Sequence, residues 1–236
     1  TLRHQYIAKF FLSDDAIDKL LEASGYYSVE ETPVDTTKFK LPTFKVVHTD
    51  KIEVLNIDGG DFVGKLIIVY DPTRIAVGYS SKLPKKGEAN KELTSGEPTS
   101  TIAKKNNAVA AINAGGFIDN GWAGTGGTPD GFIIHDKKVI YNDLESEDQE
   151  VDSVAFTDKG VLIVGKHSIN SLKKYGVKEA VSFGPPLIVN KKPSFASGDG
   201  GWGIAPRTAI AQREDGAVLL LTIDGRSLKS LGATLR

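Results

Sequence analysis

The sequence predicts an α+β domain built on a mixed, largely antiparallel sheet with a few flanking helices. Three observations lead to this fold class. Short segments rich in β-branched residues recur along the chain from Lys51 onward. Several of them are joined by tight turns of Asp, Lys and Gly, which favour hairpins and therefore antiparallel pairs. Only three segments have helical features, so the helices are expected to flank the sheet rather than alternate with its strands.

The N-terminal region is predicted to be a helix followed by a linker. Ser13 suits an N-cap, Ile17, Leu20 and Leu21 share one helix face, and Gly25 suits the helix end. Residues 26–44 have no apolar period and contain two prolines, which indicates a linker. We therefore expect residues 1–49 to form a helix and linker, and residues 50–236 to form the main domain.

The main domain is predicted to consist mainly of strands. In chain order, the expected strands are residues 51–58, 64–71, 73–80, 108–113, 131–136, 137–143, 154–157, 161–165, 178–184, 186–193, 207–212 and 217–224. Short helices are expected at 98–107, capped by Thr99 or Ser100, and at 168–175, closed by Gly176. The acidic run 143–152 lacks the spacing of a calcium loop, so we interpret it as a solvated loop.

Composition excludes several classes of protein. Twenty-nine basic and thirty acidic residues give a net charge of −1, which argues against a nucleic-acid partner. Cysteine is absent, so disulfide and thiolate chemistry are excluded. No apolar run is long enough to span a membrane. Methionine is also absent, even at position 1, so we expect the chain to be part of a longer product.

Standard catalytic and metal motifs are missing. His4, His48, His135 and His167 are scattered and are expected to be surface or packing residues. A G-x-G-x-x-G pattern occurs at Gly198, Gly200 and Gly203, and Pro206 stands where a dinucleotide-binding fold would continue as a helix. We interpret this pattern as unrelated to dinucleotide binding.

One glycine-rich stretch has the character of a ligand site. AINAGGFIDNGWAGTGGTPDGF, residues 111–132, holds seven glycines in twenty-two positions. Glycine lets a backbone approach a ligand closely because it has no Cβ. Asn113 ends the preceding apolar run, and Gly115 and Gly116 are placed to present backbone amides to a ligand. The alternative, that Asn113 is only a left-handed turn residue, stays open at this point.

Polar residues also gather at one end of the last predicted hairpin. The strand AVLLLTI ends in Asp224, Gly225 and Arg226, which form either a site or an ordinary turn with a surface arginine. If this strand pairs with 207–212, Arg207 and Thr208 lie at the same end. Two arginines match phosphate oxygens well, so the cluster favours an anionic group on the substrate.

Four segments in a fixed order resemble the phosphodiester glycosidase family: AINAGGF with GTGGTPDG, then SFGPPLIVN, then APRTAIAQREDGAVLLLTIDGR. The family domain also occurs in bacterial proteins of exopolysaccharide-biosynthesis type. The resemblance covers roughly residues 50 to 236. It implies hydrolysis of a sugar–phosphate diester with release of the free sugar, and it names no required cofactor. No metal ligand is predicted, and binding of a divalent cation is left open.

The resemblance also implies which residues line the site. Asn113, Arg207, Asp224 and Arg226 match the family's motifs, with Thr208 beside them. The substrate is expected over glycines of the same motifs, namely Gly115, Gly116, Gly127 and Gly225. The family continues to a second motif of the type N-L-D-G-G-G-S, and this chain ends at Arg236, so we expect its C-terminal part to be missing.

The expected mechanism follows from these residues. Arg207 and Arg226 would clamp the phosphodiester, and Asp224 would stabilise the oxocarbenium-like transition state. Two alternatives remain: a non-catalytic glycan-binding or cell-wall module that uses Trp122 and Trp202, and a phosphodiesterase that cuts the other P–O bond. The N-terminal stretch resembles the region after a membrane anchor, so we expect an extracytoplasmic, tethered bacterial protein that acts on a glycan.

Overall fold

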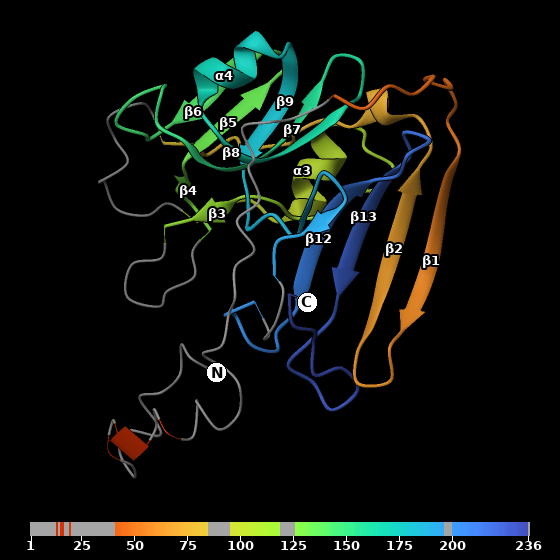
Figure 1. Ribbon diagram of the computed structural model, residues 1–236, viewed down its shortest axis with the longest axis vertical. Helices are drawn as coiled ribbons and strands as arrows, with labels where there is room; N and C mark the ends of the chain where they lie inside the picture. Colours follow the sequence, from red (N-terminus) through yellow and green to blue (C-terminus); the bar gives the residue numbers. More distant parts are fainter. Residues whose placement is uncertain are drawn as a thin grey trace.

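The protein is built on two antiparallel sheets that face each other across the molecule (Figure 1). A computed structural model describes residues 13, 15, 16, 19, 41–84, 95–118, 126–195 and 200–235. The four-stranded sheet comprises, in spatial order, β1 (Ile52–Asp58), β2 (Val63–Val69), β13 (Val218–Ile223) and β12 (Arg207–Gln212). The five-stranded sheet comprises β6 (Lys138–Asn142), β5 (Phe132–His135), β9 (Val177–Ser182), β7 (Val151–Thr157) and β8 (Leu162–His167).

The remaining elements are short. Two small hairpins pair β3 (Gly116–Phe117) with β4 (Pro129–Asp130), and β10 (Ile188–Val189) with β11 (Lys192–Pro193). From residue 41 onward, the helices in the described ranges are η2 (Pro72–Arg74), α3 (Thr99–Lys105) and α4 (Ile169–Lys174). Every strand pairing within the described residues is antiparallel, so the sheet-rich fold with few helices is confirmed, whereas no parallel pairing supports a mixed sheet there.

The five-stranded sheet is covered on both faces because its buried side chains alternate between them. One face packs Phe132, Ala155 and Ile163 against the apolar side of α4, where Ile169 and Leu172 are fully buried. The other face turns toward the four-stranded sheet. There, Val154 and Phe156 of β7 pack with Val69, Val218 and Leu220. Figure 1 shows α3 between the two sheets.

The predicted strand 73–80 is wrong. Residues 72–74 form η2, capped by Asp71, and residues 75–80 belong to no strand among the residues that the structure describes. The physical reason is that the Val77 amide donates to the carboxylate of Glu179 at 3.0 Å instead of to a neighbouring strand. Gly78 then passes so close to α3 that a Cβ there would lie 2.6 Å from the Ile102 side chain.

The predicted buried strand 108–113 is also wrong. These residues are mostly exposed and belong to no strand in the described part of the chain. Three of the six are alanines, which offer little apolar surface to bury, and the segment simply connects α3 with β3. In the same way, the predicted single strand 186–193 is the small hairpin β10–β11, because Asn190 and Lys191 adopt left-handed turn conformations.

The other predicted elements are mostly present. The hairpins at Asp136–Lys137, at 158–160 and at 214–216 are confirmed, as is the short helix predicted at 168–175, which is α4 and begins after Ser168 as its N-cap. Helix α3 is also present, although Pro98, rather than Thr99 or Ser100, stands at its N-cap. Chain 143–150 is loop, and β7 begins at Val151. The segment after Gly203 leads into strand β12 rather than a helix, which confirms that the glycine pattern is unrelated to dinucleotide binding.

Most of the N-terminal prediction lies outside the described residues. Ser13 does accept a hydrogen bond from the Ala16 amide at 3.2 Å, as expected of an N-cap, and Asp15 pairs with Lys19. The remainder of the predicted helix and most of the linker are not described. No helix in the described part of the chain is long and apolar enough to cross a membrane.

Candidate active site and adjoining cavity

The mouth of the β12–β13 hairpin collects several of the predicted site residues. Arg207 pairs in register with Ile223, so Asp224 follows directly beside it at the same end, as the sequence predicts. Asp224 is exposed, and its amide donates to the Val63 carbonyl at 2.9 Å. Continuing the strand's alternation by one residue places Asp224 on the same face as Thr222, the register partner of Thr208.

The glycine-rich segment is attached to this hairpin through side chains. The Thr208 hydroxyl donates to Asn113 Oδ1 at 2.7 Å, across 95 residues of sequence. Gly115, two residues after Asn113, has a φ of +77°, which glycine adopts without strain. The structure therefore brings Asn113, Thr208 and the backbone of Gly115 together.

The Arg207 side chain points away from the Thr208–Asn113 contact. Its Nε donates to the Ala233 carbonyl at 3.0 Å, and one terminal nitrogen donates to the carbonyls of Trp202 and Gly203. Because successive side chains of a strand point to opposite faces, Arg207 and Thr208 leave β12 on different sides. The Arg207 guanidinium therefore fixes the segments around residues 202 and 233 to the end of the hairpin.

Tight backbone contacts join the three motifs at this end. A Cβ on Gly225 would lie 2.7 Å from the Pro206 nitrogen, so D-G-R packs directly on A-P-R-T. A Cβ on Gly232 would lie 2.4 Å from the Ala205 carbonyl, and Ala205 forms a backbone bridge with Ala233. Gly225, expected to contact substrate, is thus needed here for close packing.

Arg226 projects from the turn that follows. It is exposed and has a left-handed φ of +60°. The turn is held by Ser230, whose hydroxyl donates to the Asp224 carbonyl at 2.6 Å and accepts from the Val63 amide at 3.1 Å. Among the residues that the structure describes, the Arg226 side chain forms no hydrogen bond or ion pair, so its charge is available to a ligand.

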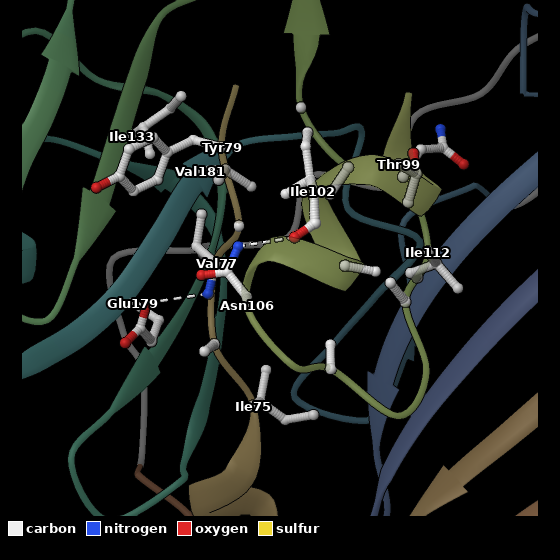
Figure 2. Close-up of a pocket in the computed structure, with 18 of the residues that line it drawn as sticks. Ile75, Val77, Tyr79, Thr99, Ile102, Asn106, Ile112, Ile133, Glu179 and Val181 are labelled. Atoms are coloured by element: carbon white, nitrogen blue, oxygen red, sulfur yellow. Dashed lines mark hydrogen bonds between the residues drawn. The ribbon is translucent and has the colours of Figure 1, made fainter. Parts of the chain in front are cut away.

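A cavity of about 720 Å³ adjoins the glycine segment between the two sheets (Figure 2). Four of the predicted site residues line it, namely Asn113, Gly115, Gly116 and Gly127. The other five stand outside its described lining: Arg207, Thr208, Asp224, Gly225 and Arg226. The Thr208–Asn113 hydrogen bond is thus the link between the hairpin mouth and the cavity.

Two carboxylates that sequence reasoning missed lie beside the glycine segment. Asp130 lines the cavity and pairs with Gly116 across the β3–β4 hairpin. Burial raises the pKa of the Asp143 carboxyl. A 2.8 Å hydrogen bond from the Gly131 amide lowers this pKa, whereas the negative charge of Asp130 raises it further. A carboxyl with a raised pKa beside a second carboxylate suits proton transfer. The signal for Asp130 was its place in the motif G-T-G-G-T-P-D-G.

Tyr141 completes this acidic cluster. Burial raises the pKa of its hydroxyl, and the charges of Asp143 and Asp130 act in the same direction. The tyrosine is 5% exposed, and its hydroxyl has no hydrogen-bond partner within the described part of the chain. No pattern in the sequence marked it, because it lies within an ordinary predicted strand.

Glu179 is a further buried carboxylate in the cavity wall, and sequence reasoning did not identify it. It is 1% exposed and accepts from the Val77 amide, the Asp136 amide and the His135 ring, the last at 2.9 Å. His135 therefore has a specific partner besides its edge contact with Tyr79. Three donors satisfy the Glu179 carboxylate, which makes it a structural anchor of the cavity wall.

Comparison with known proteins places the chain in a family. The sequence profile of the phosphodiester glycosidase family matches residues 106–236, more than half of the chain. The chain belongs to the phosphodiester glycosidase family, and the resemblance read from its motifs is confirmed. The family supports a glycosidase-type hydrolase as the class of protein.

Individual relatives extend this comparison. The chain is 28% identical over 262 aligned positions to the SPbeta prophage-derived uncharacterized protein YomE of Bacillus subtilis strain 168. The alignment covers 97% of this chain and 39% of that protein, so the chain spans about two fifths of the relative's length.

Two solved structures share the fold. The zebrafish N-acetylglucosamine-1-phosphodiester alpha-N-acetylglucosaminidase catalytic domain, auto-inhibited by its pro-peptide, has a TM-score of 0.55 at 18% identity, over 83% of this chain and 69% of that one. A hypothetical protein from Synechocystis has a TM-score of 0.52 at 15% identity, over 82% of this chain and 54% of that one. At these identities the likeness establishes the fold.

Proposed function

We propose that this protein hydrolyses the glycosidic bond of a sugar–phosphate diester and releases the free sugar. Family membership supports a hydrolase of this type. The observation that carries the proposal is the 2.7 Å hydrogen bond between Thr208 and Asn113, because it joins the glycine-rich segment to the hairpin that ends in Asp224. The sugar would then lie between a close-approach backbone and a carboxylate.

Each proposed role follows from the position of the residue. Asp224, exposed at the end of β13, stabilises positive charge as the bond from the anomeric carbon to the phosphate oxygen breaks. Water supplies the new hydroxyl at that carbon, and the phosphate leaves as a monoester with the bridging oxygen. Arg226 binds the phosphate charge, and Asn113 with the amides of Gly115 and Gly116 holds sugar hydroxyls.

Arg207 is proposed to act mainly as a positioning residue. Three backbone carbonyls already accept from its guanidinium, which supports a role in holding the mouth of the hairpin in place. The second carboxyl group that glycoside hydrolysis commonly uses is proposed to be Asp130, beside Gly116 in the cavity lining.

The biological setting is likewise a proposal. We propose that the substrate is a cell-surface or exopolysaccharide-related glycan, and that the protein works outside the cytoplasm on an upstream membrane tether. Fractionation of cells that express the full-length gene product tests this, with recovery in the cytosol as the outcome that would contradict it.

The activity is tested with the methyl phosphodiester of N-acetylglucosamine 1-phosphate, the linkage in the name of the zebrafish neighbour. We expect Asp224→Asn to lower kcat/KM by about 10²-fold or more, as loss of a catalytic carboxylate commonly does. Glu214→Gln, at the far end of the same hairpin, is the matched control and should retain activity. Equal kcat/KM for both variants would remove Asp224 from the mechanism.

Product analysis separates the alternatives. Free sugar plus phosphate monoester supports the proposed bond cleavage, whereas sugar 1-phosphate indicates a phosphodiesterase. A glycan-binding module would bind without turnover and would depend on Trp202, which is 50% exposed beside the hairpin mouth. Trp122, the other aromatic candidate, lies outside the described residues.

A further inference from the structure

The cavity between the sheets is too large to be a packing defect. Protein interiors are close-packed and leave few voids larger than a water molecule. Sites for small molecules commonly have volumes of about 300–1,000 Å³, and this cavity has about 720 Å³. Its size is therefore that of a binding site.

Aliphatic side chains from three separate parts of the chain make up much of its wall. Figure 2 shows them around one space, contributed by the segment after η2, by α3 with the segment that follows it, and by the five-stranded sheet. They are Ile75, Val77, Ile102, Ile112, Ile133 and Val181. A surface of this kind favours a saturated hydrocarbon over a sugar, because it offers van der Waals contact without hydrogen bonds.

Two polar side chains in this part of the wall already have protein partners. The Glu179 carboxylate accepts from Val77, Asp136 and His135. The Asn106 amide donates to the Ile102 carbonyl at 2.8 Å (Figure 2). A ligand hydroxyl placed beside Glu179 or Asn106 would have to break these bonds or remain unpaired, and each buried unpaired group is costly.

The same cavity also has a polar, glycine-rich part of its wall. Asn113, Gly115 and Gly116 line it, and Asn113 is hydrogen-bonded to Thr208 at the mouth of the hairpin. One cavity is thus lined both by this glycine-rich segment and by aliphatic side chains. This arrangement fits an amphiphile with its polar group at the glycine segment and its chain between the sheets.

We propose that the cavity binds the apolar aglycone of the substrate, so that the substrate is a glycosyl phosphodiester of a long-chain alcohol. This inference takes one point from the proposed function, namely that the sugar phosphate binds at the glycine segment. The alkyl chain then lies against Ile102, Ile133 and Val181, and the phosphate lies at the glycine segment, on the side of the cavity that is linked to the hairpin mouth through Asn113 and Thr208.

The kinetic test compares N-acetylglucosamine 1-phosphate diesters of methanol, butanol and decanol, each below its micellar concentration. Each buried methylene favours binding by about fourfold. We expect KM to fall by at least about tenfold from the methyl to the decyl diester.

Val77→Phe and, independently, Ile75→Trp narrow the cavity and should remove this dependence on chain length. Ala211→Phe, on an exposed position of β12, is the matched control and should preserve it. Thermal unfolding verifies that each variant is folded.

A binding measurement separates this inference from the proposed function. Decyl phosphate and methyl phosphate are titrated by calorimetry, without any turnover. Tight binding of decyl phosphate that Val77→Phe weakens supports the apolar site even if no diester is hydrolysed. Equal kcat/KM for all three diesters, or equal affinity for decyl and methyl phosphate, would overturn the inference while leaving glycosidase activity intact.

Discussion

At the residue scale, two buried carboxylates illustrate how hydrogen bonds make burial of an acid tolerable. Glu179 is satisfied by three donors, two of them backbone amides. Asp71, 4% exposed, accepts from the Thr73 amide at 2.9 Å and the Thr73 hydroxyl at 2.6 Å, and lies 3.0 Å from His48 Nδ1. Both side chains fix loops at the ends of strands.

Asp71 makes stability depend on acid. Burial raises the pKa of its carboxyl, but the hydrogen bonds from Thr73 and His48 outweigh burial and hold this pKa below its usual range. The folded state therefore binds this proton less readily than the unfolded chain. The stability that Asp71 contributes is present above the unfolded pKa of about 3.9 and is lost as pH falls through the lower folded value.

We predict that Asp71→Asn lowers the free energy of unfolding by about 1.5–3 kcal/mol at neutral pH, since hydrogen bonds to a charged group are lost. The loss should shrink in acid, because the wild-type carboxylate becomes protonated there. Urea unfolding at a series of pH values measures it, with Asp58→Asn, at an exposed site, as control. A loss that stays constant down to pH 2 would contradict this account.

At the element scale, the segment 75–80 shows what a local sequence pattern leaves out. TRIAVGYS has the alternation and β-branched content of a strand, yet it crosses between the sheets. Its course is set by Glu179, which lies about a hundred residues further on, and no local pattern reports that partner. The prediction of a strand at AVAAIN was wrong for a related reason, since an apolar run forms a strand only where a neighbouring strand has a free edge to pair with.

We predict that Glu179→Gln loosens this segment. Two of the three donors point at one carboxylate oxygen and one at the other, so a carboxamide nitrogen must face at least one N–H group. The unpaired group should lower stability by about 1–3 kcal/mol. Hydrogen exchange at the Val77 amide should accelerate, and Glu214→Gln at the surface should leave it unchanged. Unaltered protection of Val77 would show that the carboxylate does not anchor the segment.

Hairpins, in contrast, were predictable from sequence because their turns are local. The residues between β12 and β13 specify a tight turn, and antiparallel pairing then requires Arg207 and Asp224 to lie at one end. The 2.7 Å bond from Thr208 to Asn113 could not be derived in this way, because it joins segments 95 residues apart. The cavity was equally hidden, since it arises from the spacing between the sheets.

At the scale of the whole molecule, the motifs of the family meet through glycines that allow backbones to touch. Gly225 packs on Pro206 and Gly232 on Ala205, and the Ala205–Ala233 bridge holds these contacts together. The same contacts position Arg207, Asp224 and Arg226. Stability and activity are therefore expected to depend on the same small region.

We predict that Gly232→Ala lowers both the free energy of unfolding and the hydrolytic activity. Its φ is +107°, and a Cβ would lie 2.4 Å from the backbone of Ala205. The loss of stability should exceed about 1 kcal/mol, and kcat/KM should fall with it. Two causes contribute at Gly232, the strained φ and the contact with Ala205. Gly60→Ala measures the cost of the strained φ alone, because Gly60 has a φ of +84° with open space around it. Denaturant unfolding and diester hydrolysis measure both effects, and equal losses for the two variants would mean that the contact with Ala205 is unimportant.

The apolar wall of the cavity has a thermodynamic consequence. Burial of apolar surface on binding gives a negative change in heat capacity. An alkyl chain seated against Ile102, Ile133 and Val181 would cover apolar side chains of the cavity wall. The binding enthalpy of decyl phosphate should therefore become more negative as temperature rises, whereas that of methyl phosphate should change much less.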